Sequence, residues 1–216
     1  MLSAYLCFES LQWIDNFWVA LLVAPILVGI LGIIVERFFL RRLERGDLGH
    51  IGQILLTLGV SLMILGVVKI RWSTEPLVIR MPESLEGLVN IFGLEYPIYR
   101  LFIIAISLLI LGILSFLLYK TRLGKIVRAA VTDADMVDAL GINIPLVFTS
   151  IFGIGTWMAG VAGVVSAPML SVFPGLADQI GMDAFVVVIV GGFGSLLGAL
   201  LASLVFGELN SFGVQF

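Results

Sequence analysis

Five apolar runs of about 20 residues recur along this sequence, and they constrain its fold more than any other feature. Each is long enough to cross the ~30 Å hydrocarbon core of a bilayer as a helix. The runs are continuously apolar rather than alternating, which disfavours a strand barrel. We therefore expect an all-α polytopic transmembrane helix bundle, a single membrane domain over residues 1–216, with spans at about 17–35, 49–68, 99–119, 146–170 and 184–207.

Composition excludes several classes of protein. Of 216 residues, 60% are hydrophobic and 12% are charged, whereas a soluble domain is about half apolar and about a quarter charged. The single cysteine, Cys7, and the single histidine, His50, leave no internal disulfide and no Cys/His metal cluster. A net charge of -3 with dispersed basic residues does not suit a nucleic-acid partner. We expect no cofactor.

The middle of each run contains no Asp, Glu, Lys, Arg or His. Pumps and ion-coupled carriers usually keep such groups there, and an intramembrane protease needs a serine with a base, paired aspartates or a zinc motif. We therefore expect neither ion coupling within this chain nor enzymatic activity. Energy for any transport would then come from a partner. The first span is expected to end at Glu36 and Arg37, the first charged residues after its apolar run.

Lysine and arginine predict the orientation. If the N-terminus lies outside, the inner loops hold eight basic residues and the outer loops four, which satisfies the positive-inside rule. The inner set is Arg37, Arg41, Arg42, Arg45, Lys120, Arg122, Lys125 and Arg128.

The inner segment 120–145 is more than a connector. Thr132 with Asp135 three residues later resembles a capping box, and Gly141 stands where a helix C′ glycine is expected. The predicted helix of about eight residues is too short to be stable alone and must pack on something. It could lie on the membrane or its own bundle, or dock a cytosolic partner, which we favour. Met136, Val137, Ala139 and Leu140 would form its apolar face, and Asp133, Asp135 and Asp138 its acidic face.

Small residues dominate the last two spans. Gly155, Ala159, Gly163 and Ala167 recur at every fourth position and predict a face for close helix packing. In the fifth span one stripe holds Gly191, Ser195, Ala199, Ser203 and Gly207, and a second holds Gly194, Gly198 and Ala202. Three glycines in four positions cost roughly 1 kcal/mol each relative to alanine, which predicts a kink or break. Gly191, Gly192, Gly194, Ser195 and Gly198 are candidates for a translocation path or for helix packing.

Polar residues on the second span form another candidate face. Gln53, Thr57 and Ser61 are spaced four apart and so share one side of a helix. They could line a path or bond to a neighbouring helix.

Longer segments carry a family resemblance. They are TRLGKIVRAAVTDADMVDALGIN, DAFVVVIVGGFGSLLGALLASLVFGEL after the glycine-patterned fourth span, and upstream ERFFLRRL and QILLTLGVSL. Together they resemble the permease subunits of bacterial ABC importers for branched-chain amino acids, of the LivH kind, over nearly the whole chain.

The resemblance implies a multi-pass subunit in the bacterial inner membrane that pairs with a second related permease. Cytosolic ABC ATPase subunits and a periplasmic solute-binding protein would complete the importer. The segment from Asp133 to Gly141, namely Asp133, Asp135, Met136, Asp138, Ala139, Leu140 and Gly141, would be the coupling helix that docks in a groove of the ATPase. Members of the family usually have further spans before and after this region, so we expect a fragment or a shortened product.

Alternatives remain open. Relatives handle urea, short amides or sugars, so the solute could be another small polar molecule. A non-transporting membrane scaffold and a passive channel are the other hypotheses.

Overall fold

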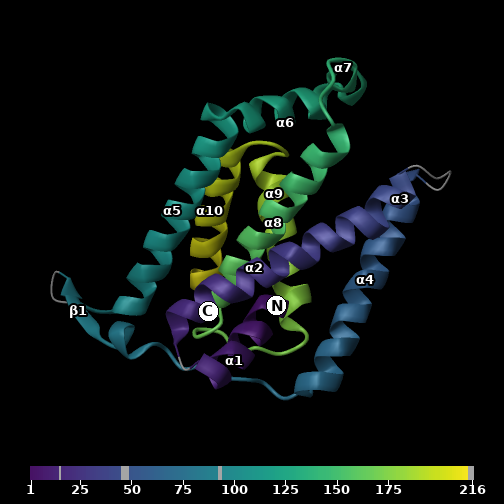
Figure 1. Cartoon of the computed structure of the whole chain (residues 1–216). Coiled ribbons are helices and arrows are strands. Elements are labelled where there is room, and N and C mark those ends of the chain that lie inside the picture. The colour runs from purple at the N-terminus through teal and green to yellow at the C-terminus, as the bar shows by residue number, and fades with distance from the viewer. Residues whose placement is uncertain (15, 45–48, 92–93, 214–216) are drawn as a thin grey trace. The chain divides into compact units, whose positions relative to one another are not determined.

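The computed structural model describes residues 1–14, 16–44, 49–91 and 94–213, which are mostly helical (Figure 1). They form two compact units, Met1–Pro174 and Gly175–Phe216, which we describe separately. The predicted all-α membrane bundle is confirmed. Among the described residues five helices are long and apolar enough to span a bilayer, at Phe17–Leu40, Gly52–Trp72, Ile98–Lys120, Ile144–Ser166 and Leu196–Gly213. The single membrane domain over residues 1–216 stays a prediction.

The first unit contains most of the helices. Their order is α1 (Leu2–Ile14), α2 (Phe17–Val35), η1 (Glu36–Leu40), α3 (Arg41–Glu44), α4 (Gly49–Trp72), η2 (Glu83–Leu85), α5 (Ile98–Lys120), α6 (Arg122–Thr132), α7 (Ala134–Ala139) and α8 (Ile144–Ser166). The helix α6 crosses the end of α5 and leads to α7, at the opposite end of this unit from α1 (Figure 1).

Close packing of α2 against α8 holds the first unit together. A Cβ added at Gly160 would lie 2.9 Å from the Cα of Pro25, and one added at Gly29 would lie 3.2 Å from the Cβ of Trp157. The two backbones therefore approach as closely as small residues allow. Gly153 and Gly160, two helical turns apart, are both buried on this side of α8.

The small-residue face predicted for span four is covered only in part within this chain. Gly155 and Ala159 are exposed. Gly163 lies against Ser3 of α1, and Ala167 belongs to the buried core. The face of α8 that α2 covers is offset from this repeat, because a repeat of four residues drifts around a helix of 3.6 residues per turn.

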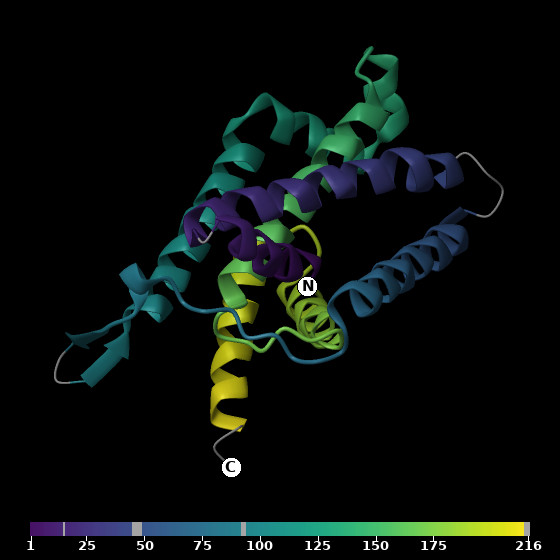
Figure 2. The same ribbon diagram turned by 60° about the horizontal axis from the view of Figure 1, so that its bottom comes forward.

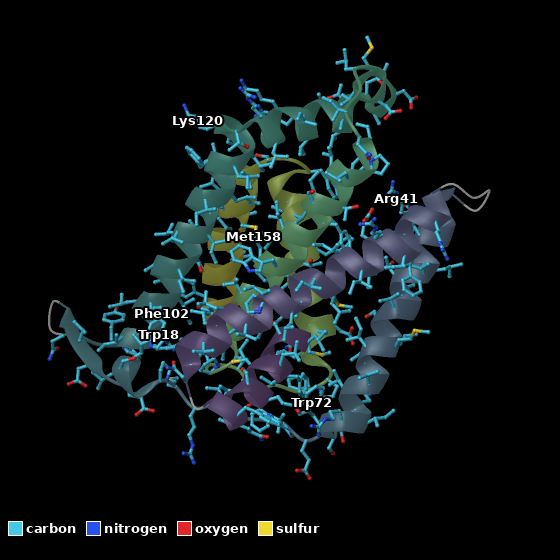
Figure 3. The ribbon with its side chains drawn as sticks, viewed as in Figure 1. Trp18, Arg41, Trp72, Phe102, Lys120 and Met158 are labelled. Carbon is cyan, nitrogen blue, oxygen red and sulfur yellow. The ribbon has the colours of Figure 1, made fainter. Side chains whose placement is uncertain are left out.

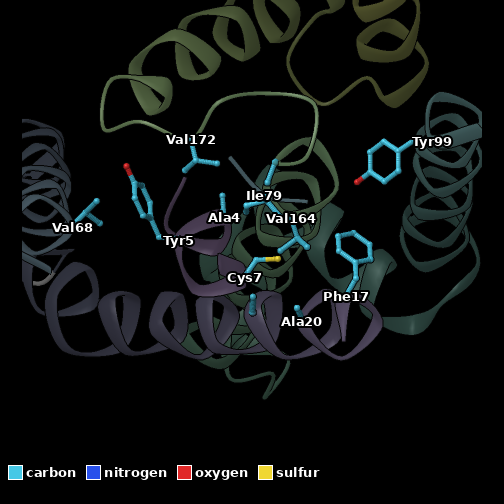
Figure 4. Close-up of a cluster of buried hydrophobic side chains, with 12 residues drawn as sticks. Ala4, Tyr5, Cys7, Phe17, Ala20, Val68, Ile79, Tyr99, Val164 and Val172 are labelled. Atoms are coloured by element: carbon cyan, nitrogen blue, oxygen red, sulfur yellow. The ribbon is translucent and has the colours of Figure 1, made fainter. Parts of the chain in front are cut away.

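A buried core closes one end of the first unit (Figure 4). It joins α1, the start of α2, the end of α4, the start of α5 and the end of α8. The hydroxyl of Tyr99 donates a hydrogen bond to the carbonyl of Val165 over 2.8 Å, which ties α5 to α8. The rings of Trp18 and Phe102 are 5.6 Å apart (Figure 3). Core residues include Ala4, Tyr5, Cys7, Phe17, Ala20, Val68, Ile79, Val164 and Val172.

The connection between α4 and α5 contains a feature that the sequence analysis missed. Strands β1 (Leu88–Ile91) and β2 (Leu94–Pro97) pair antiparallel, with Val89 opposite Tyr96. Figure 2 shows this hairpin beside the start of α5. Upstream, Leu77 and Val172 exchange backbone hydrogen bonds of 2.9 Å, which fasten the connection to the segment after α8.

The α-helix α2 ends at Val35, as predicted for the first span, but the candidate membrane span runs on past Glu36 and Arg37 to Leu40. The helix continues as the π-helix η1 and then as α3. The N–H of Glu36 donates to the carbonyl of Gly32, and the N–H of Arg41 donates to the carbonyl of Glu36. Charged residues alone do not stop a helix, because neither blocks the backbone hydrogen bonds as proline does. Arg45, part of the predicted basic inner loop, lies outside the described residues.

The second unit contains the region predicted as the fifth span. Within the predicted span 184–207 the chain forms two helices, α9 (Leu176–Gly191) and α10 (Leu196–Gly213). The predicted break is confirmed at Gly192 and Gly194, whose φ angles are +86° and +84°. Only glycine adopts such angles without steric cost. A single stripe from Gly191 to Gly207 therefore cannot exist.

We predict that Gly160→Val destabilises the protein by about 1–3 kcal/mol, because its side chain would push against the α2 backbone at Pro25. Gly155→Val on the same helix is the matched control, since a Cβ there meets no atom within 4 Å. Denaturant titration of both variants in detergent measures the difference. Equal stabilities would contradict the close α2–α8 contact.

Candidate functional site

The short helix α7 has a defined beginning. Asp133 has an extended backbone, and its side chain accepts a hydrogen bond from the N–H of Met136 over 3.0 Å. Asp133 is therefore the N-cap. The expected cap, Thr132, instead donates its hydroxyl to the carbonyl of Arg128 over 3.0 Å, at the end of α6. The predicted capping box is wrong, and α7 has six residues rather than about eight.

The end of α7 matches the prediction. Gly141 has a φ of +82°. Its N–H donates to the carbonyl of Asp138 over 2.8 Å, and the N–H of Ile142 donates to the carbonyl of Val137 over 3.4 Å. These two bonds form a Schellman motif, which satisfies carbonyls that a helix end otherwise leaves free. The α7 backbone is thus fixed at both ends.

The faces of α7 differ from the expectation. Val137 is buried against Ala130 of α6 and Ile144 of α8. Met136 is 64% exposed and Leu140 is 74% exposed, so the four predicted apolar residues do not share one covered face. We call the exposed residues the α7 surface: Asp133, Asp135, Met136, Asp138, Ala139 and Leu140.

Basic residues adjoin α7 along α6. The hydroxyl oxygen of Thr121 accepts a hydrogen bond from the N–H of Gly124 over 3.3 Å and so caps α6. Gly124 allows the tight turn, because a Cβ there would collide with the backbone of Leu118. The guanidinium of Arg128 lies 5.4 Å from the centre of the Tyr119 ring. Exposed Arg122, Lys125 and Arg128 suit contact with lipid headgroups, and Lys120 ends α5 beside them (Figure 3).

A buried carboxylate was missed by the sequence analysis. Glu36 in η1 is only 6% exposed, and the hydroxyl of Thr149 on α8 donates a hydrogen bond to its Oε2. A cavity of about 250 Å³ adjoins it. Its lining is Glu36, Leu40, Arg41, Gln53, Phe148, Ile151 and Phe152. The available signal was that residues 33–44 contain neither glycine nor proline, so a helix can continue through Glu36.

The structure separates the polar residues predicted on span two. Gln53 lines the cavity beside Glu36. Thr57 is exposed, and its hydroxyl donates to the carbonyl of Ile54 in its own helix over 2.9 Å. Ser61 is also exposed. A path or a helix contact along this face stays a prediction.

The glycine-rich candidates meet within the second unit. A Cβ at Gly191 would lie 2.6 Å from the amide nitrogen of Ala199, and one at Gly198 would overlap the carbonyl of Gly191. The Oγ of Ser195 accepts a hydrogen bond from the N–H of Gly198 over 3.0 Å, at the start of α10. Gly191 and Gly198 therefore let α9 and α10 touch, while Gly192 and Gly194 are exposed in the turn. This favours helix packing, and a pathway role stays a prediction.

Among the residues that the structure describes, no three His, Cys, Asp or Glu side chains gather as a metal site requires. The exposed α7 surface and the basic helix beside it lie beyond apolar helices that are long enough to span a membrane. Residues 1–216 match the family described as branched-chain amino acid transport system / permease component. The chain belongs to this family. It is a family of transport permease components rather than of enzymes.

Three curated permease proteins illustrate what this chain is similar to. The chain is 27% identical over 190 residues to the high-affinity branched-chain amino acid transport system permease protein BraD of Pseudomonas aeruginosa, covering 85% of this chain and 61% of BraD. It is 38% identical over 101 residues to LivH of Escherichia coli, covering 46% and 32%. It is 22% identical over 205 residues to the ribose import permease protein RbsC of Haemophilus influenzae, covering 89% and 58%.

The permease chain thus spans less than two thirds of the length of each of these relatives. No solved structure matches it. The family and the membrane helices make it a multi-pass membrane protein.

We predict that Gly198→Leu separates α9 from α10, because the new side chain would overlap the backbone of Gly191. Hydrogen exchange of amides in the facing turns should speed up about tenfold or more, as local opening becomes easier. Gly207→Leu on α10 is the control, because a Cβ there meets nothing within 4 Å. Equal exchange in both variants would show that α9 and α10 do not depend on this contact.

Proposed function

We propose that this chain is a membrane-spanning permease subunit of an ATP-driven ABC importer in the bacterial inner membrane. Its solutes would be branched-chain or other hydrophobic amino acids, by similarity to the branched-chain amino acid permease proteins BraD and LivH. The observation that carries the proposal is α7, a short helix fixed at both ends that exposes apolar and acidic side chains beyond the spans.

Cytosolic ABC ATPase subunits are the proposed partners of the α7 surface. Met136 and Leu140 offer exposed apolar side chains of the kind that fill a groove on a partner. Asp133, Asp135 and Asp138 surround them with negative charge and would favour a basic rim on that groove. Because both ends of α7 are capped, little ordering cost would be added on docking.

Force on α7 has a direct route into the spans. Val137 packs between Ala130 of α6 and Ile144 at the start of α8. The helix α8 in turn packs along α2. A displacement of α7 by an ATPase would therefore move α8 and α2, and different contacts in two states are what conformational coupling requires.

Further partners follow from the same proposal. A second related permease and a periplasmic solute-binding protein would complete the importer. The apolar stretches of α4 and α5 are almost entirely exposed in this chain, with 6% and 0% of their residues buried. This exposure supports contact with lipid or with helices of another permease. The importer as a whole would hydrolyse ATP in its separate ATPase subunits.

A second candidate solute class is a small polar molecule such as urea, an amide or a sugar. The similarity to a ribose import permease over 89% of this chain favours keeping it. Competition of radiolabelled leucine uptake by unlabelled ribose, urea and acetamide separates the two classes. A non-transporting scaffold would show no ATP-dependent uptake of any solute.

We predict that Leu140→Glu lowers both ATP-dependent uptake and ATPase co-purification about tenfold or more, because it places a charge in a hydrophobic anchor. Insertion should stay normal, since the Leu140 side chain is 74% exposed. Val131→Glu is the matched control, because Val131 is equally exposed, at 74%, on neighbouring α6. Unchanged uptake in the Leu140 variant would remove the docking role and would favour the scaffold.

We also predict that α7 faces the cytosol. In intact cells a membrane-impermeant maleimide should leave the Asp135→Cys variant unlabelled, and in inside-out vesicles it should label it. The native Cys7, in α1 outside the five candidate spans, is buried, and burial raises the pKa of its thiol to about 11, so little reactive thiolate exists at neutral pH. Labelling in intact cells would reverse the proposed orientation.

A further inference from the structure

The carboxylate of Glu36 is buried, so we expect it to have a charged partner. A carboxylate removed from water is costly unless it is paired or well hydrogen-bonded. Within the described residues its recorded hydrogen-bond donor is the Thr149 hydroxyl, which is neutral. Glu36 lies in a π-helical turn, a rare geometry that is frequent at functional sites. An ionisable group at the end of a membrane span is likewise a reason to look for a ligand.

Arg41 supplies the opposite charge without neutralising Glu36. The backbone N–H of Arg41 donates to the carbonyl of Glu36, so the two residues lie one π-turn apart. Both line the same cavity. Within the described part of the chain the recorded salt bridge joins Arg71 to Glu9, and none joins Glu36 to Arg41. The cavity therefore offers one negative and one positive group that do not pair with each other. Figure 3 labels Arg41 at this end of the first unit.

The rest of the lining is mostly apolar. Phe148, Ile151 and Phe152 are spaced i, i+3 and i+4 and so share one side of α8. Leu40 comes from η1, and Gln53 adds an amide from α4. At about 250 Å³ the cavity lies below the ~300–1,000 Å³ of sites for drug-sized ligands, so it suits a small solute. A few polar groups that fix orientation among apolar walls are typical of such sites.

We propose that this cavity binds an aliphatic amino acid as its zwitterion. The Glu36 carboxylate would receive the α-ammonium group, with Thr149 holding the carboxylate in place. The Arg41 guanidinium would hold the α-carboxylate, and the aliphatic side chain would lie against Phe148, Ile151 and Phe152. The solute class rests on the proposed function, whereas the assignment of these residues rests on the cavity itself. A sugar or urea carries no charge that could pair with the Glu36 carboxylate or the Arg41 guanidinium.

The position of the cavity gives the site a role in release. Phe148 and Thr149 lie in the first turns of α8, directly after α7. The cavity is thus at the α7 end of α2 and α8, on the cytosolic side in the proposed orientation. Movement of α7 would shift the α8 wall relative to η1, so docking and ATP hydrolysis would alter how tightly the solute is held there.

Three ligands test the charge assignment on the full chain in lipid nanodiscs. They are L-leucine, 3-methylbutylamine, which lacks the carboxylate, and 4-methylpentanoate, which lacks the ammonium group. Saturation-transfer NMR with titration measures each affinity, and empty nanodiscs correct for partition into lipid. Glu36→Gln should weaken leucine and the amine about tenfold or more and leave 4-methylpentanoate unchanged. Arg41→Gln should weaken leucine and 4-methylpentanoate and leave the amine unchanged.

Glu9→Gln is the matched control. Glu9 also has a charged hydrogen bond, to Arg71 over 2.6 Å, but it lies on α1, which contributes no residue to the cavity lining. It should leave all three affinities unchanged. Parallel losses for all three ligands, or no saturable leucine binding by the unaltered chain, would overturn the assignment. ATP-dependent leucine uptake that depends on Leu140 would, in that case, leave the proposed function standing and remove only this site.

Discussion

Contact between the backbones of α2 and α8 is the constraint on which the first unit depends. Pro25 and Gly29 on one helix meet Gly160 and Trp157 on the other with no room for an added Cβ at Gly160. Hydrophobic force does little to join helices in lipid, so van der Waals contact between small residues has to supply the attraction. With these helices fixed, the core around Tyr99 closes one end of the pair, and the bond from Thr149 to Glu36 joins them near the other.

Features set by local chemistry could be predicted from the sequence. Five spans follow from run length, and Gly141, Gly192 and Gly194 occupy the positive φ angles that helix ends require. Features that depend on contacts between residues far apart in the sequence could not be predicted from it. Thr132 and Asp133 can both cap a helix, and only the path of the backbone decided for Asp133. The bond between Glu36 and Thr149 joins residues 113 apart in sequence, and no pattern near either one signals it.

The same distinction explains the two small-residue predictions. A stripe of glycine and alanine says that some helix can approach, but which side is covered depends on where that helix lies. On α8 the covered side holds Gly153 and Gly160 rather than Gly155 and Ala159. In the second unit the glycines act across a turn instead of along one helix, because the break at Gly192 folds α10 back on α9, where Gly191 meets Gly198.

Charged residues of the first unit lie at its two ends, and those of the candidate sites lie at the α7 end. The acidic α7 surface, the basic side chains of α6 and the Glu36–Arg41 cavity all lie at that end, whereas the middle of the spans stays apolar. A carboxylate in the middle of the bilayer would cost several kcal/mol to keep ionised, roughly 2.5–3.5 kcal/mol even by insertion scales. At the end of a span water and a zwitterionic solute can share that cost. In the proposed importer the driving subunits lie outside the membrane, and the Glu36–Arg41 cavity lies at the same end of the spans as the α7 surface.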